Sequence, residues 1–80
     1  MNAGLEDKKK FRVWHVSPLG EIVQSCASAE ISAEAERRVE RAFPQHSVVG
    51  SCVHNDEHVA TVIRAKSRKL ANKMISRRNS

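Results

Sequence analysis

Histidine and cysteine are the side chains of this 80-residue sequence best suited to metal binding or nucleophilic chemistry. The candidates are Cys52, His54 and His58, with His46 and Cys26 as additional ones. The step from His54 to His58 has a spacing found in zinc sites, but such a site needs four convergent ligands. A Cys–His nucleophile needs an orienting third group and a cleft, for which so small a domain has little room. We therefore expect no metal, no cofactor, no catalytic residue and no enzymatic activity.

A basic tract near the C-terminal end is the stronger chemical signal. Residues 64–78 contain no Asp or Glu, and residues 47–80 carry seven Lys/Arg against two Asp/Glu, whereas residues 1–46 carry seven of each. Lysine and arginine that neutralise phosphates release counterions, which drives binding to nucleic acid. The tract predicts a surface for nucleic acid or another partner, formed by Arg64, Lys66, Arg68, Lys69, Lys73, Arg77 and Arg78. Charge runs are also common on ordinary solvated helices, so the tract does not identify the partner.

A second group of cations precedes the first predicted strand. Lys8, Lys9 and Lys10 end an N-terminal arm, residues 1–10, which we expect to be flexible and separate from a single domain over residues 11–78. Such an arm can reach a phosphate backbone or simply increase solubility. We treat these three lysines as a second candidate contact for the same partner.

A β-hairpin is predicted by the residues that follow the arm. Phe11–Val16 is rich in aromatic and β-branched residues. Pro18 and Gly20 suit a tight turn, and residues 21–27 form the return strand. Trp14 could stack on a base, but the interleaved basic, glycine and aromatic residues of RNA-binding sheets are missing. We expect Trp14 in the core, while the pattern leaves open which strand face is buried.

A helix and a third strand come next. Residues 32–43 place apolar side chains on one helix face, with Ser32 as the expected N-cap and Pro44 ending the helix. Ser47–His54 then has the composition of a strand.

Residues 55–78 leave two alternatives open. In the preferred one, His58–Arg64 is a fourth strand, since four of the five residues 59–63 are β-branched. Ser67 then caps a short helix that carries the basic tract. In the other, Asn55 caps one long helix that runs to about Ile75. Within either helix, the spacing predicts that Lys69 and Lys73 face solvent, opposite Leu70 and Met74.

The preferred order is β-β-α-β-β-α, in a small two-layer α+β domain with an antiparallel sheet and both helices on one face. The alternative is β-β-α-β followed by one long C-terminal helix. The layout, though no motif, resembles that of small accessory proteins of phages and plasmids. No apolar run reaches the roughly 20 residues of a membrane span, and the N-terminal residues lack the apolar segment of a signal peptide. We therefore expect a cytoplasmic protein; a homodimer would enlarge the small core but nothing demands one.

These patterns predict a small, non-enzymatic, basic binding protein that acts on nucleic acid or a nucleoprotein complex. The alternative function is a protein–protein inhibitor or adaptor, docking on an acidic or a nucleic-acid-binding partner surface.

Overall fold

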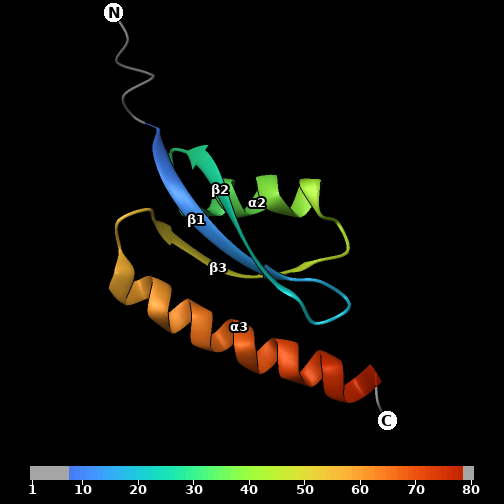
Figure 1. Ribbon diagram of the computed structural model, residues 1–80. Helices are drawn as coiled ribbons and strands as arrows, with labels where there is room; N and C mark the ends of the chain where they lie inside the picture. The colour runs from blue at the N-terminus through green and yellow to red at the C-terminus, as the bar shows by residue number, and fades with distance from the viewer. Residues whose placement is uncertain (1–7, 79–80) are drawn as a thin grey trace, which may run out of the picture.

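Three strands and two helices make up the fold of the computed structural model, which describes residues 8–78 (Figure 1). In chain order they are β1 (Lys9–Val16), β2 (Ile22–Ala29), α2 (Ser32–Ala42), β3 (Ser47–Val53) and α3 (Glu57–Arg78). The α+β class is confirmed. The element order is that of the alternative prediction, one long C-terminal helix, and the preferred fourth strand over His58–Arg64 is wrong.

Residues 57–78 form the helix α3 and not a strand, because the side chains that pack on the sheet are spaced three and four residues apart. Its buried residues Ala60, Ile63, Ser67 and Ala71 follow one another at steps of three and four. Burial of such a stripe outweighs the modest helix-propensity cost of the β-branched residues beside it. The N-cap is Asp56 rather than Asn55: its carboxylate accepts a hydrogen bond from the backbone N–H of Val59 at 3.1 Å.

The sheet has the order β2-β1-β3, and both pairings are antiparallel. The turn from β1 to β2 is closed by the bond from Gly20 N–H to the carbonyl of Ser17, as the sequence predicts. The return strand continues to Ala29, two residues beyond the predicted end. A bulge interrupts the pairing of β1 with β3, where Gly50 opposes Trp14 and Val48 opposes His15.

The helices cover opposite faces of the sheet, so the molecule has three layers (Figure 1). Phe11 and Val13 of β1 pack against Ala35 and Val39 of α2. Trp14, which points to the other side of the strand, packs with Cys52 of β3 and with Ala60 and Ile63 of α3. The predicted two-layer arrangement with both helices on one face is therefore wrong. The central strand carries apolar side chains at both odd and even positions, and each set needs its own cover.

The helix α2 ends one residue before its predicted limit. Ser32 is its first helical residue, and Ile31 occupies the N-cap position without a side-chain hydrogen bond, so the predicted Ser32 cap is wrong. Glu36 accepts a hydrogen bond of 2.6 Å from the hydroxyl of Ser51, which ties α2 to β3. None of the helices within residues 8–78 is long and apolar enough to cross a membrane.

Candidate nucleic-acid interface

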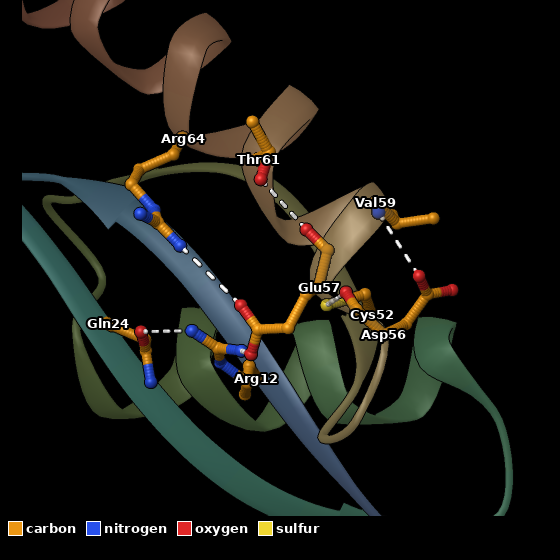
Figure 2. Close-up of polar contacts among 8 residues, drawn as sticks. All are labelled: Arg12, Gln24, Cys52, Asp56, Glu57, Val59, Thr61 and Arg64. Carbon is orange, nitrogen blue, oxygen red and sulfur yellow. Dashed lines mark hydrogen bonds and ion pairs between the residues drawn. The ribbon is translucent and has the colours of Figure 1, made fainter.

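A polar cluster holds the N-terminal end of α3 against the sheet (Figure 2). Arg12 of β1 donates to Glu57 at 2.7 Å and to Gln24 of β2 at 3.2 Å. Its guanidinium also lies 4.9 Å from the centroid of the Trp14 ring, within cation–π range. Glu57 also forms an ion pair of 3.9 Å with Arg64, about two turns further along the helix. These contacts fix which side of α3 faces the sheet, and hence which cations face solvent.

Ser67 lies in the middle of α3 and is fully buried. Its hydroxyl donates to the carbonyl of Ile63 at 2.9 Å, one turn back along the same helix. The prediction that Ser67 caps a helix is therefore wrong. The expected orientation around it holds: Lys69 and Lys73 are exposed, while Leu70 and Met74 are half-buried.

Four of the predicted cations form a basic stripe along one face of α3. The members of the basic stripe are Lys66, Lys69, Lys73 and Arg77, and all four are exposed. Successive members are three or four residues apart, which keeps them on one side of a helix. At 1.5 Å per residue the stripe runs for about 16 Å along the helix axis.

The remaining cations of the predicted tract lie elsewhere on α3. Arg64 and Arg68, one turn apart, project on the other flank of the buried stripe, where Arg64 pairs with Glu57. Arg78 is the last residue of α3, and its side chain lies outside the described part of the chain. The tertiary structure thus divides the tract into two flanks instead of presenting it as one surface.

The three lysines of the second candidate contact lie away from the basic stripe. Lys8, Lys9 and Lys10 are exposed, and the last two belong to β1 rather than to the predicted arm over residues 1–10. Residues 1–7 of that predicted arm lie outside the described residues. The strand β1 begins beside the N-terminal end of α3 and runs toward its C-terminal half (Figure 1). The two groups of cations are therefore at opposite ends of the helix–sheet unit.

The sheet offers no aromatic platform for unpaired bases. Trp14 is 2 % exposed and Phe11 is 5 % exposed, and α3 and α2, respectively, cover them. The expectation that Trp14 belongs to the core is confirmed. Base stacking of the kind used by RNA-binding sheets would require such rings to be open to solvent.

The two cysteines are separated by the central strand. Cys26 of β2 and Cys52 of β3 both oppose Arg12, from either side, and both are free. Two strand spacings make about 9.5 Å, which is beyond the reach of a disulfide. Cys52 is buried, its thiol donates to the carbonyl of Asp56 at 3.6 Å, and burial raises its pKa. Among residues 8–78 no group of three or more His, Cys, Asp or Glu is placed to hold a metal ion.

A part-buried polar chain on the α2 side of the sheet was not predicted from the sequence. His15 is fully buried, with Nε2 at 2.8 Å from Ser25 Oγ and Nδ1 at 2.8 Å from His46 Nδ1. Phe43 packs on both imidazoles, with ring centroids 4.7 Å and 4.9 Å away. A histidine inside an otherwise apolar strand, between Trp14 and Val16, was the one sequence signal that could have indicated it.

The β2–α2 pocket adjoins this polar chain. It has a volume of about 540 Å³ and is lined by Ser25, Cys26, Ala27, Ser28, Arg38, Val39, Ala42 and Phe43. Arg38 is held by Glu34, one turn back on α2, at 3.1 Å.

Comparison with protein-family models, with curated proteins and with solved structures returns no match for this chain.

Proposed function

We propose that α3 binds the phosphate backbone of double-stranded nucleic acid without reading its base sequence. The observation that carries the proposal is the basic stripe, four exposed cations on one helix face. Residues 58–78 contain no acidic residue to oppose a phosphate. Phosphate contacts of this kind supply the sequence-independent part of nucleic-acid affinity.

A duplex suits this surface better than a single strand. Single-strand binders combine a basic groove with aromatic rings on which bases stack, and both aromatic residues of β1 are buried. An α-helix is about 10–12 Å wide with its side chains, and the major groove of B-DNA is about 12 Å wide. The stripe contains only lysine and arginine side chains, which contact phosphates in any sequence, so weak base preference is expected.

The salt dependence of binding tests the proposal. We expect a fluorescently labelled 20-base-pair duplex to bind at low ionic strength, in an anisotropy titration, with similar affinity for unrelated sequences. Four neutralised phosphates predict a slope of log K against log salt of about −3.6. Single strands of the same sequence should bind more weakly.

Charge reversal on the basic stripe gives the sharper comparison. Lys69→Glu with Lys73→Glu should move the salt slope toward zero by about two and lower affinity more than about tenfold at low salt. Arg37→Glu with Arg41→Glu is the matched control, since both residues are exposed on α2, have the same spacing and cause the same change in net charge. This control should retain most of the affinity.

Equal losses in the two double variants would mean that only net charge matters, and the stripe would lose its role. If the unmodified protein binds no nucleic acid at low salt, the proposal fails. An acidic protein surface, as expected for an inhibitor or adaptor, would then be the remaining class of partner.

A further inference from the structure

A line of three hydrogen-bonding side chains leads from the β2–α2 pocket into the protein. Ser25 Oγ, which borders the pocket, lies 2.8 Å from His15 Nε2, and His15 Nδ1 lies 2.8 Å from His46 Nδ1. The order is a hydroxyl, a buried imidazole and a second imidazole. This is the order of a nucleophile, a general base and a group that orients the base.

Two arrangements of protons satisfy this chain. In one, Ser25 donates its hydroxyl proton to His15 Nε2, and His15 Nδ1–H donates to His46 Nδ1. In the other, both bonds run the opposite way, and Ser25 Oγ accepts from His15. Only the first leaves Nε2 able to take a proton from the serine.

The surroundings of His15 keep its ring neutral. The ring has no exposed surface, and its pKa is lowered by burial and, secondly, by the neighbouring His46. Phe43 packs on the ring at 4.7 Å between centroids and helps to close it off from water. A neutral imidazole with a fixed orientation is the form that can act as a general base.

The pocket also supplies groups that suit developing negative charge. The turn bond from Ser17 N–H to the carbonyl of Glu21 makes these two residues a bonded pair, and bonded pairs alternate along an antiparallel ladder. Cys26 lies five residues beyond Glu21, an odd number, so its pair with Arg12 is a non-bonded one and its N–H points toward the free edge of β2. Arg38 lines the same pocket from α2. A backbone N–H next to a nucleophile is a common donor to the oxyanion of acyl transfer.

We propose that Ser25 is a nucleophile toward small carboxylic esters, with His15 as its general base and His46 as a positioning residue. Ser25 Oγ forms a bond to the ester carbonyl carbon while its proton passes to His15 Nε2. The ester C–O bond then breaks, and the alcohol leaves with that proton. Water, deprotonated by the same nitrogen, then adds to the acyl carbon, the bond from that carbon to Ser25 Oγ breaks, and the proton on His15 Nε2 returns to Oγ as the free acid leaves. The inference is independent of the nucleic-acid proposal, because it concerns the other side of the sheet.

A covalent probe tests this role without an identified substrate. The experiment uses the full chain with Cys26→Ser, which removes the exposed thiol of the residue next to Ser25, and a fluorophosphonate reagent read out by peptide mass spectrometry. A general base accelerates such reactions by about 10²–10⁴-fold. Ser25 should therefore be labelled at least about 100-fold faster than Ser28, which lines the same pocket and is an internal control. Hydrolysis of p-nitrophenyl acetate should disappear in Ser25→Ala.

Two further measurements separate catalysis from a purely structural hydrogen bond. His46→Gln should slow labelling of Ser25 more than about tenfold in a variant that circular dichroism shows to be folded. Nitrogen-15 NMR of the unsubstituted protein should show His15 protonated at Nδ1 and unprotonated at Nε2. The proposal is overturned by equal labelling of Ser25 and Ser28, by labelling that His46→Gln leaves unchanged, or by a proton on His15 Nε2.

Discussion

His15 lies between Trp14 and Val16 in the central strand, and its ring is fully buried. Its burial is tolerable because Ser25 and His46 satisfy both ring nitrogens. A second proton on the ring would place a positive charge in a buried site, which is costly. The folded protein therefore favours the neutral ring, which agrees with its lowered pKa.

Stability should consequently fall on mild acidification. Because the folded-state pKa of His15 is lowered, the unfolded chain binds the proton first, near pH 6.5. Above that pH the contribution of His15 to the free energy of unfolding is fully present. It is lost progressively as the pH falls toward the folded-state pKa. Urea titrations at pH 7.5 and 5.5 measure the change. His46 is the titratable group that faces the ring and Arg38 is the charge on the pocket wall, so both are left unaltered.

The His15→Gln variant should lose most of this pH dependence, although it is less stable at both pH values. His58→Gln is the control, since His58 is exposed on α3, and it should keep the wild-type difference. If His15→Gln retains the full difference between the two pH values, the dependence belongs to other groups.

The helix α3 illustrates at the element scale how position decides what a polar residue does. Asp56 caps it, while Ser67, expected to be a cap, is bonded inside it. Asp56→Ala should lower the free energy of unfolding by about 1 kcal/mol, as lost N-caps do. Ser67→Ala should change it by less than about 0.5 kcal/mol, because alanine has higher helix propensity and the Ile63 carbonyl keeps its backbone partner. A loss of about 1 kcal/mol or more in Ser67→Ala, measured by urea unfolding, would contradict this assignment.

The hairpin turn is the second contact that fixes α3. Gly20 has a φ of 88°, and a Cβ added there would lie 2.7 Å from Ile75 Cγ1 and 3.2 Å from the carbonyl oxygen of Ala71. Gly20→Ala should destabilise the protein by about 1–3 kcal/mol through backbone strain and this overlap. In an Ile75→Ala background the same change should cost less, about 1 kcal/mol, because only the backbone strain and the approach to the Ala71 carbonyl remain.

Gly50→Ala is the control for that experiment. Its φ is not positive, and an added Cβ would meet Ile63 at an ordinary contact distance of 3.4 Å. Thermal unfolding of the unsubstituted protein, of Gly20→Ala, of Ile75→Ala and of the double variant gives the coupling between Gly20 and Ile75. Strictly additive effects would mean that the turn and α3 are not in contact.

At the scale of the whole molecule, the positive charge is distributed over separate places. The basic stripe lies along α3, while Lys8–Lys10 lie at the start of β1, beside the opposite end of that helix. Surface charges further apart than a Debye length, about 10 Å at 0.1 M salt, act almost independently. We therefore expect the lysines at the start of β1 to contribute little to the affinity for a short duplex bound to the basic stripe.

Lys9→Glu with Lys10→Glu should accordingly change the affinity for a 10-base-pair duplex by less than about threefold at 0.1 M salt. The reversal of Lys69 and Lys73 produces the same change in net charge and should weaken binding far more. Anisotropy titrations of both variants against the same duplex make the comparison. Equal weakening would show that the binding surface extends over both ends.

Several elements of the fold could be predicted because neighbours along the chain decide them. The hairpin of β1 and β2, its glycine turn, the helix α2 with its proline stop, and β3 follow from local propensity and alternation. The exposure of Lys69 and Lys73 followed from helical spacing alone.

Contacts between distant residues decided the rest. The β-branched run at Val59–Ile63 has strand propensity, but it became helix because Ala60 and Ile63 are buried against Trp14 and Cys52. The three-layer arrangement followed because β1 is central and apolar on both faces. The alternation of its residues could not show that both faces are covered. Ser25, His15 and His46 meet across separations of 10 and 31 residues. Local propensities differ by only about 1 kcal/mol, and burial across such separations outweighs them.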